Sequence, residues 1–310
     1  MKHAFIMDPI DGIKPWKDTT YFLMKACADR GHEICYLDQR DLHTRHHQLF
    51  GCVKWLQIHN DKENPYSIIH SEKIAISGVD AVWIRTDPPF DRRYFYTTLL
   101  LELLPEFVHV INCPEGIRNY NEKLSALKFP DLTPHTLVTS NLDEIDDFAR
   151  QYGRVTIKPI DGFGGKGIMF FEAGDSIDHL KLHIQGNHRW MIVQEYLPEA
   201  AEGDKRILLL DGEPLGAILR VHADGEELNN MDAGGSAHAS KLTTMDLEIC
   251  GVLKEPLKAE GIFFAGIDII GDKLIEINVT SPTGLQEMSR FDGIDYHHQI
   301  IRELESKTRG

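Results

Sequence analysis

Near its carboxyl end the 310-residue chain reads Gly266-Ile267-Asp268-Ile269-Ile270-Gly271-Asp272-Lys273-Leu274-Ile275-Glu276-Ile277-Asn278. Apolar and polar residues alternate on both sides of a Gly-Asp-Lys break, a pattern that predicts a β-hairpin. One parity is expected to form a buried apolar face, and its members are Ile267, Ile269, Ile275 and Ile277. The other parity carries three oxygen donors, which are Asp268, Glu276 and Asn278.

The length of the hairpin loop decides which side chains face each other. A two-residue turn at Gly271-Asp272 would place Asp268 opposite Ile275 and mix the two faces. A three-residue loop, which ends at Lys273, places Asp268 opposite Glu276 and keeps the isoleucines on one side. Loops of this length that contain glycine are common in hairpins. We therefore predict the longer loop.

Two carboxylates that face each other across a hairpin repel unless a cation lies between them. A ligand set made only of oxygen atoms suits Mg²⁺ or Mn²⁺ better than zinc. The pattern therefore predicts a site for a hard divalent cation. The alternative is that the polar parity is the solvated outer face of an edge hairpin.

The composition is that of a globular protein, with 42% hydrophobic and 26% charged residues, and the length suggests two or three domains. A formal charge of −15 argues against broad binding to nucleic acid or to membrane surfaces. The five cysteines are scattered and include no CxxC pair, so we expect reduced thiols. We find no signal peptide and no apolar stretch that could span a bilayer, and therefore expect a cytoplasmic protein.

The order of elements predicts a small open α/β domain over residues 1–115, followed by a strand-rich region. In the first part we expect strands at 3–7, 34–37 and 81–84, a helix at 18–30 capped by Asp18 or Thr19, loops and weak strands over 41–75, and a linker at 112–120. Later we expect helices at 121–129, 141–152, 244–260 and 294–306, strands at 154–158, 167–172, 190–196, 205–210 and 214–220, and a long loop at 222–240.

A second strong signal is the glycine-rich segment between two of these strands. Its glycines can bring bare backbone N–H groups close to phosphate, and they are Gly162, Gly164, Gly165 and Gly167. The segment joins strand to strand, and Lys158 precedes the glycines, so the Rossmann fingerprint and the P-loop are both excluded. We predict a flap over a nucleotide, with Lys158 directed at phosphate. The alternative is a plain glycine-rich turn with a surface lysine.

Other residues complete a pattern typical of phosphoryl transfer. Lys123, at the start of a predicted helix, could contact a second phosphate, and the strand at 193–198 could seat an adenine. Arg206 and Arg220 flank a predicted turn and suit a carboxylate or an acyl-phosphate, although a pair of surface salt bridges is the alternative. No motif of a hydrolytic triad or of an H-E-x-x-H zinc site is present.

These parts, in this order, resemble the ATP-grasp superfamily, and their details resemble the prokaryotic glutathione synthetase family. The resemblance spans nearly the whole chain, and its most specific motifs are the two-proline run after Arg85 and the run at 278–283. The motifs that carry it are Met7-Asp8-Pro9-Ile10, Arg85-Thr86-Asp87-Pro88-Pro89-Phe90-Asp91, Asn121-Glu122-Lys123-Leu124, Thr136-Leu137-Val138-Thr139, Gly203-Asp204-Lys205-Arg206 and Ile277-Asn278-Val279-Thr280-Ser281-Pro282-Thr283.

The resemblance implies an α/β (α+β) ATP-grasp fold with an N-terminal open α/β domain. The implied domains are a substrate-binding domain at 1–120, a lid with the glycine flap at 121–200 and a catalytic part at 201–310. The implied activity joins γ-glutamylcysteine to glycine through an acyl-phosphate, with ATP and Mg²⁺ or Mn²⁺. The implied partners are these small molecules and further copies of the chain, without nucleic acid or membrane.

The resemblance also implies a role for individual residues. Arg206 and Arg220 would be catalytic, and the hairpin residues Asp268, Glu276 and Asn278 would hold the metal. ATP would be held by Lys123, Lys158, Gly162, Gly164, Gly165, Gly167, Gln194, Glu195, Tyr196, Leu197 and Asp204. The other substrates would be held by Arg85, Asn230, Gly234, Gly235, Ser281 and Thr283.

One stretch departs from the family pattern. Where the family has an arginine ahead of a Gly-Gly pair, this chain has Leu228, and an acidic Asp232 has entered the same loop. The change favours, as one alternative, a ligase for a different amino-acid or peptide pair. A non-catalytic nucleotide-binding module is the other alternative.

Overall fold

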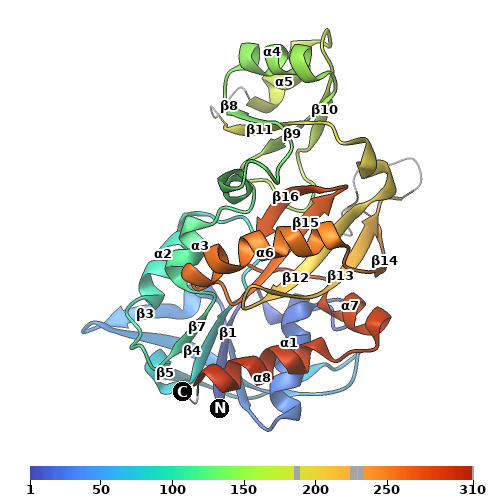
Figure 1. The fold of residues 1–310 in the computed structure, drawn as a ribbon. Helices are drawn as coiled ribbons and strands as arrows, with labels where there is room; N and C mark the ends of the chain where they lie inside the picture. The colour runs from blue at the N-terminus through green and yellow to red at the C-terminus, as the bar shows by residue number, and fades with distance from the viewer. Residues whose placement is uncertain (185–188, 224–228, 230–233, 309–310) are drawn as a thin grey trace.

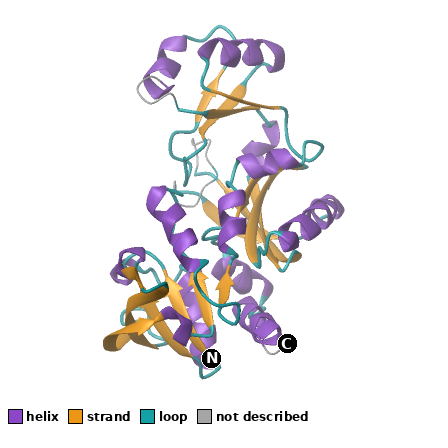
Figure 2. Cartoon of the chain, turned by 90° about the vertical axis from the view of Figure 1, so that its left-hand side faces the viewer, coloured by secondary structure: helices purple, strands orange, loops and turns teal. Residues whose placement is uncertain are grey.

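Three β-sheets follow one another along the molecule (Figure 1). The computed structural model describes residues 1–184, 189–223, 229 and 234–308. The side view in Figure 2 shows the same succession, with helices on the outer side of the uppermost sheet. This mixed α/β architecture agrees with the fold class predicted from the sequence. No helix among the described residues is long and apolar enough to cross a membrane.

The first sheet has seven strands and contains the predicted β-α-β order. Its parallel part consists of β1 (Lys2–Ile6), β2 (Glu33–Leu37), β6 (Ala81–Ile84) and β7 (His109–Ile111). Helix α1 (Thr19–Asp29) begins as predicted after Asp18, whose side chain accepts a hydrogen bond from the Tyr21 N–H at 2.9 Å. The cap therefore fixes where the first helix starts.

The prediction of loops and weak strands over 41–75 was wrong. This segment forms β3 (Leu42–Arg45), the long β4 (Gln48–Ile58) and β5 (Tyr66–Ala75), all antiparallel. Strand β4 buries alternate residues, whereas most of β5 is exposed and therefore carries no apolar alternation. His46 and His47 lie in the turn between β3 and β4, and both have positive φ angles.

Between the first and second sheets the chain forms short helices instead of the predicted linker and α-helix. These are α3 (Pro114–Asn119) and the 3-10 helix η4 (Leu124–Lys128), whereas α2 (Arg92–Leu101) lies earlier, between β6 and β7 of the first sheet. Other 3-10 turns are η1 (Ile10–Gly12), η2 (Gln39–Asp41), η3 (Ile76–Gly78) and η5 (Pro198–Glu202).

The second sheet has four strands in the order β10-β9-β11-β8. They are β8 (Thr136–Thr139), β9 (Val155–Pro159), β10 (Met169–Phe171) and β11 (Met191–Glu195). Helices α4 (Leu142–Tyr152) and α5 (Ile177–Ile184) lie at the outer end of the molecule, over this sheet (Figure 1). The predicted helix at 141–152 is confirmed as α4, which ends at Gly153 and buries Ile145 and Ala149.

The third sheet has five antiparallel strands in the order β14-β13-β12-β15-β16. They are β12 (Asp204–Leu210), β13 (Glu213–Val221), β14 (Ser236–Ser240), β15 (Phe264–Ile270) and β16 (Lys273–Asn278). Helix α6 (Thr244–Ala259) packs on this sheet, while α7 (Leu285–Asp292) and α8 (Tyr296–Thr308) pack against α1. The end of the predicted loop at 222–240 is in fact strand β14.

The β15–β16 hairpin confirms the predicted pairing but not the predicted loop. Asp268 lies opposite Glu276, yet Ile270 pairs with Lys273, so the turn has two residues. A bulge restores the register, because Ile269 opposes Leu274 and Ile275 is the extra residue. Leu274 therefore replaces Ile275 in the core, where it is fully buried with Ile267, Ile269 and Ile277.

A continuous core joins the first sheet to the carboxyl-terminal helices. Phe5 and Leu23 belong to the same buried cluster as Leu208 of β12 and Ile301 of α8. The second sheet has a separate core, in which Ile157 and Val193 pack with the α4 residue Ile145. The first and third sheets therefore share a scaffold on which the second sheet is mounted.

Candidate active site

A cavity of about 740 Å³ lies between the sheets and is lined by residues of the second and third sheets and of the segments that follow β1 and β6 in the first sheet. Most of the residues predicted for the site line it, namely Arg85, Lys123, Lys158, Gly162, Gly164, Gly165, Gln194, Glu195, Tyr196, Leu197, Asp204, Arg206, Arg220, Gly235, Asp268, Glu276, Asn278, Ser281 and Thr283. Gly167 and Gly234 do not line it. Asn230 lies outside the described residues, as do Leu228 and Asp232 of the departing loop.

The floor of the cavity is the polar face of the β15–β16 hairpin. Asp268 is only 6% exposed, so this face is not the solvated edge that the sequence left as an alternative. The Asp268 carboxylate accepts hydrogen bonds from Arg206 and Arg220, each with an Nη2–Oδ2 distance of 2.8 Å. Burial disfavours its charge, but the two guanidinium groups outweigh burial and hold the pKa of Asp268 well below its usual range.

Strand register explains why these charges meet. Arg206 of β12 lies directly opposite Asp268, and Asp204 lies opposite Arg220 of β13. Arg220 donates from Nε to Asp204 Oδ1 at 2.7 Å as well as to Asp268. Both arginines are at most 6% exposed, so they form a buried network inside the cavity and not surface salt bridges.

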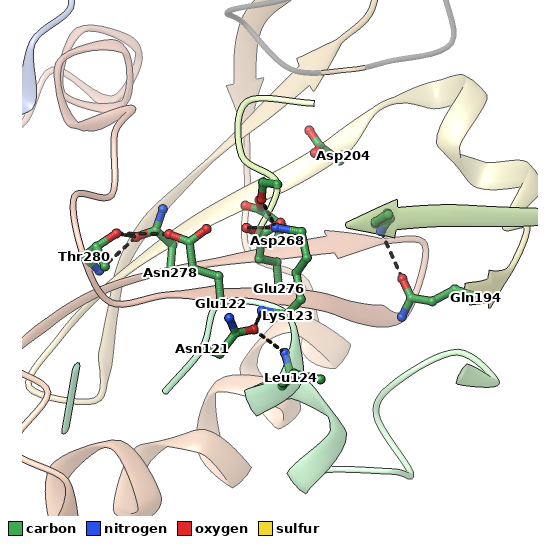
Figure 3. Close-up of polar contacts among 12 residues, drawn as sticks. Asn121, Glu122, Lys123, Leu124, Gln194, Asp204, Asp268, Glu276, Asn278 and Thr280 are labelled. Carbon is green, nitrogen blue, oxygen red and sulfur yellow. Dashed lines mark hydrogen bonds and ion pairs between the residues drawn. The ribbon is translucent and has the colours of Figure 1, made fainter. Parts of the chain in front are cut away.

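The segment before η4 runs beside β16 and brings two more charges to the floor (Figure 3). The backbone N–H of Ile277 donates to the Glu122 carbonyl at 2.8 Å, which covers the edge of the sheet. Lys123 Nζ consequently lies 3.6 Å from Glu276 Oε1 and donates to the Gly162 carbonyl at 2.5 Å. Lys123 thus connects the flap with the hairpin.

Glu122 is a residue of the site that the sequence reasoning missed. Its side chain accepts a hydrogen bond from Thr280 Oγ1 at 3.0 Å and lines the cavity. Burial, reinforced by the negative charge of Glu276, raises the pKa of Glu122 to about 8. Its position next to Lys123 in the Asn-Glu-Lys-Leu motif was the only sequence signal that could have identified it.

Lys158 and Gln194 project into the cavity from neighbouring strands of the second sheet. Lys158 Nζ donates to Gln194 Oε1 at 3.0 Å, and Gln194 Nε2 donates to Thr136 Oγ1 at 3.1 Å. Burial lowers the pKa of Lys158 to about 8. The lysine is therefore enclosed in the cavity, and is not the surface lysine of the alternative interpretation.

The predicted flap is the connection between β9 and β10. Gly164 and Gly165 adopt positive φ angles of 62° and 75°, which residues other than glycine rarely adopt. Gly162, Phe163 and Lys166 line the cavity together with these two glycines. The flap therefore presents backbone to the same space as Lys123 and Lys158.

The far side of the cavity is formed by the segments that follow β1 and β6 and by the segment after β16. Arg85 is 5% exposed and donates to Thr20 Oγ1 at 3.1 Å and to the Pro282 carbonyl at 3.0 Å. Ser281 Oγ donates to Asp87 Oδ1 at 2.7 Å. Arg85 thus links α1 to the segment that follows β16, and Asp87 links the same segment to the loop before α2.

Asn229 is a second residue that the sequence reasoning missed. It is 7% exposed, lines the cavity and donates from Nδ2 to the Ala200 carbonyl at 2.8 Å. The sequence reasoning chose its neighbour Asn230, and two adjacent asparagines in a loop cannot be told apart by pattern.

The oxygen donors of the floor fit a hard divalent cation. Carboxylates from Asp268 and Glu276 and the amide of Asn278 all line one cavity, with the Glu122 carboxyl group beside them. Such oxygen sets bind Mg²⁺ or Mn²⁺ in preference to softer metals. The positively charged side chains of Lys123 and Lys158 line the same cavity.

Comparison with known proteins identifies the family. The N-terminal domain of prokaryotic glutathione synthetase matches residues 1–118, and the ATP-grasp domain of the same enzyme matches residues 122–293. The chain belongs to the prokaryotic glutathione synthetase family. It is an ATP-dependent ligase of the ATP-grasp type, and the resemblance inferred from its motifs is confirmed.

Relatives from several organisms match over the full length. The glutathione synthetase of Gloeobacter violaceus is 41% identical, and the match covers 100% of this chain and 98% of the relative. The glutathione synthetase of Nitrosomonas europaea is also 41% identical, with 98% of each chain covered.

Solved structures of more distant ligases share the fold. D-cycloserine synthetase DcsG superimposes with a TM-score of 0.65 at 17% identity, over 98% of this chain and 99% of that one. The ATP-grasp ligase PsnB, solved with a precursor peptide and AMPPNP, gives a TM-score of 0.64 at 17% identity, over 100% of this chain and 98% of that one. These likenesses support the ATP-grasp fold.

Proposed function

We propose that this chain synthesises glutathione by ligating γ-glutamylcysteine to glycine at the expense of ATP. The observation that carries the proposal is the cavity, in which two lysines, a glycine flap, two arginines and an oxygen-rich floor converge. Full-length relatives at 41% identity that are named glutathione synthetase support the choice of substrates.

The nucleotide end of the cavity is formed by the second sheet and the flap. Lys123 and Lys158 would bind the phosphate groups, and the flap from Gly162 to Gly167 would cover them. The strand end at Gln194, Glu195, Tyr196 and Leu197 would hold the adenine. Mg²⁺, held by Asp268, Glu276 and Asn278, would neutralise phosphate charge, and Mn²⁺ has the same ligand preference.

The chemistry needs two transfers. A cysteinyl carboxylate oxygen of γ-glutamylcysteine attacks the γ-phosphorus of ATP, which forms an acyl-phosphate and releases ADP. The amine of glycine then attacks the acyl carbon, loses a proton and expels inorganic phosphate. Arg206 and Arg220 would stabilise the negative charge that develops on oxygen in both steps.

The three sheets suggest how these tasks are divided. We propose a substrate-binding domain at 1–120, a lid with the flap at 121–200 and a catalytic part at 201–310. Asp204 would hold Arg220 in place beside the nucleotide, and Arg85, Ser281 and Thr283 would contact the peptide. We also propose that the peptide is contacted by Asn230, Gly234 and Gly235. The enzyme is proposed to be a homo-oligomer.

The direct test is release of ADP by the purified chain with ATP, Mg²⁺, γ-glutamylcysteine and glycine. We expect turnover that requires both substrates, and glutathione as the product. Controls replace γ-glutamylcysteine with other thiol dipeptides and glycine with other amines. Absence of ADP with the first pair, alongside ADP with another pair, would overturn the proposal.

The two alternatives left by the sequence are not favoured. A ligase for another pair was suggested by Leu228 and Asp232, yet relatives named glutathione synthetase match the chain over its full length. A non-catalytic module does not explain why Arg206 and Arg220 are buried in the cavity beside the oxygen-rich floor.

A further inference from the structure

Arg154, which lies immediately before β9, contacts two aromatic rings of the second sheet. Its guanidinium carbon is 4.3 Å from the centre of the Tyr196 ring and 4.6 Å from the centre of the Phe170 ring. The two rings also meet edge to face, with centres 5.8 Å apart and planes at 80°. A guanidinium over the face of an aromatic ring is attracted to it at such distances. One cation therefore holds together two rings from different parts of the sheet.

The pairing of the strands explains why these three side chains meet. Phe170 of β10 and Gln194 of β11 both lie opposite Thr156 of β9. Tyr196 is two residues after Gln194, and its N–H donates to the Arg154 carbonyl at 3.0 Å, which extends the pairing of β9 with β11. Because side chains alternate along a strand, Arg154 and Thr156 share one face of the sheet with both rings.

This face of the second sheet is the one that lines the cavity. Thr156 and Lys158 line it from β9, and both rings line it from the neighbouring segments, whereas Arg154 does not. Lys158 is assigned above to phosphate and Tyr196 to adenine, so the row on β9 leads from the phosphate end toward the base. Phe170 is not among the residues assigned to ATP. Arg154 thus contacts the rings at the base end without occupying the cavity.

We propose that Phe170 is a further contact for the adenine, and that Arg154 is a positioning residue that holds Phe170 and Tyr196 in place for the base. This assignment rests on the proposed function, since it deepens the adenine site named there. Ordering a side chain when a ligand binds costs affinity, and a ring that is already fixed avoids that cost. The cation fixes both rings before the nucleotide arrives.

The carboxylate of Glu172 is the other charged group that Arg154 meets. Arg154 Nε lies 3.8 Å from Glu172 Oε1, and the Glu172 side chain is 63% exposed. A long ion pair at the surface contributes little, because solvent screens it. The contacts with the rings are therefore assigned the positioning role, and the ion pair is not.

The test measures binding of ADP, with Mg²⁺ present, by equilibrium calorimetry. Arg154→Met keeps the length of the side chain and removes the cation, and we expect the affinity for ADP to fall by about 3- to 10-fold, the value of one ordered side chain. Arg154→Lys returns a cation to the rings without the planar guanidinium and should give an intermediate affinity.

A double-mutant cycle tests whether Arg154 acts through the rings. Phe170→Leu alone should weaken ADP by about 3-fold or more, because stacking on the base is lost. In a protein that carries both Phe170→Leu and Tyr196→Leu, the further change Arg154→Met should alter ADP affinity by less than about 2-fold. A merely structural role of Arg154 would give the same loss in both backgrounds.

Two control variants match the chemical changes. Arg150→Met removes an arginine from α4 whose side chain is 65% exposed and pairs with Asp146. Glu172→Gln removes the ion pair and leaves Arg154 beside the rings. Each should change ADP affinity by less than about 2-fold.

Unchanged ADP affinity in Arg154→Met would overturn the inference, and so would a loss that persists without the rings or a loss as large in Glu172→Gln. If Arg154→Met does not fold, Phe170→Leu and Arg154→Lys decide, and full affinity in both overturns the inference. Absence of ADP binding to the unaltered protein would also overturn it. Ring-dependent loss of ADP affinity without synthesis of glutathione would leave the inference standing and contradict the proposed function, whereas glutathione synthesis with full ADP affinity in Arg154→Met would do the reverse.

Discussion

At the scale of single residues, the buried charges of the site are paired with neighbours of opposite sign. Asp204, Arg220, Asp268 and Arg206 alternate in sign along a chain of ion pairs. Removing one member of a buried pair leaves an uncompensated charge, which typically costs about 3–5 kcal/mol. Truncation of these residues would therefore lower stability as well as activity, and variants that test catalysis should keep the shape of the side chain.

Glu276→Gln meets that condition. The substitution keeps the shape but removes a negative oxygen from the proposed metal site and the charge that faces Lys123 at 3.6 Å. We expect turnover to fall by more than about 100-fold, since changes even beyond the direct ligands cost about 10–100-fold. ADP release measures turnover, and thermal melting should shift by no more than about 4 °C.

The matched control is Glu248→Gln, which makes the same chemical change on the exposed side of α6. It should alter neither turnover nor melting. Normal turnover in Glu276→Gln would refute the metal assignment, and Mn²⁺ affinity, measured by electron paramagnetic resonance, should fall in parallel with activity.

Lys158 predicts a pH dependence of ATP binding. Burial lowers its pKa to about 8, so the side chain loses its charge as pH rises through that value. Bound phosphate favours the charged form, hence ATP binding near pH 8.5 should take up a proton. The dissociation constant for ATP should rise by up to about tenfold per pH unit above pH 8. Calorimetry in buffers with different heats of ionisation measures the uptake.

Lys158→Arg separates this lysine from other groups that titrate nearby. The pKa of Glu122 is also about 8, so proton exchange in the unaltered protein contains more than one contribution. A guanidinium stays charged throughout this range, so the variant should lose the uptake due to residue 158. Identical uptake in both proteins would assign the effect to another residue.

At the scale of elements, the bulge in the β15–β16 hairpin places two neighbouring apolar residues in different surroundings. Leu274 is fully buried in the core of the third sheet, whereas Ile275 lines the cavity. These neighbours should therefore report on different properties. Leu274→Ala should lower the free energy of unfolding by about 3 kcal/mol and change ATP affinity by less than about 3-fold.

Ile275→Ala should show the reverse pattern. We expect ATP affinity to fall by about tenfold, because the proposed nucleotide site loses an apolar side chain from its lining, and stability to fall by about 1 kcal/mol or less. Urea unfolding and calorimetry of the two variants make the comparison. If Ile275→Ala destabilised the protein as much as Leu274→Ala, the residue would belong to the core, as a bulge-free hairpin requires.

The same hairpin shows how far the sequence could predict the structure. Keeping the isoleucines on one face required Asp268 to lie opposite Glu276, and that pairing was found. Alternation could not reveal how the register was achieved, because a longer loop and a two-residue turn with a bulge satisfy the same polar face. The bulge turns Ile275 out of the core so that it lines the cavity, and this cavity cannot be read from the alternation of the hairpin alone.

Helix α4 was predictable because its burial is one-sided, whereas strand β4 was missed although it buries alternate residues. Helix α4 buries one stripe and begins and ends where its Asn141 cap and Gly153 indicate. Strand β5 was missed because most of it is exposed and shows no alternation, and η4 was predicted as an α-helix because propensity does not distinguish a short 3-10 turn. Glu122 was missed because its proximity to Glu276 arises from chain segments that are distant in sequence.

At the scale of the whole molecule, one buried amide joins the first sheet to the third. The side chain of Asn112, just after β7, donates to the carbonyls of Phe264 at 2.7 Å and Val279 at 2.8 Å. Its oxygen accepts from the N–H groups of Phe263 and Phe264, both at 2.8 Å. All four hydrogen bonds are made with backbone groups at the start of β15 and after β16. The amide therefore fixes the end of β7 in the first sheet to the β15–β16 hairpin, which forms the floor of the cavity.

Asn112→Ala should therefore destabilise the protein strongly. Four buried backbone groups would lose their partner, and each unsatisfied group costs about 1–3 kcal/mol, although the costs do not add fully. We expect a loss of about 4 kcal/mol or more in urea unfolding. The control is Asn119→Ala, which removes a 3.0 Å bond to Glu260 across an exposed part of the same interface and should cost less than about 1 kcal/mol.

Asn112→Asp distinguishes the donor role of the amide from its shape. The carboxyl group has the same size, but its ionised form would place negative oxygen against the Phe264 and Val279 carbonyls, whereas its protonated form can still donate to one of them. The folded state should thus raise the pKa of the introduced carboxyl group above its unfolded value of about 3.9. A group with a raised folded pKa loses its stabilising contribution as pH rises, so the variant should approach the stability of the unaltered protein near pH 4 and fall behind it toward pH 7. A deficit that is equal at both pH values would mean that the amide hydrogens are not what holds the two sheets together.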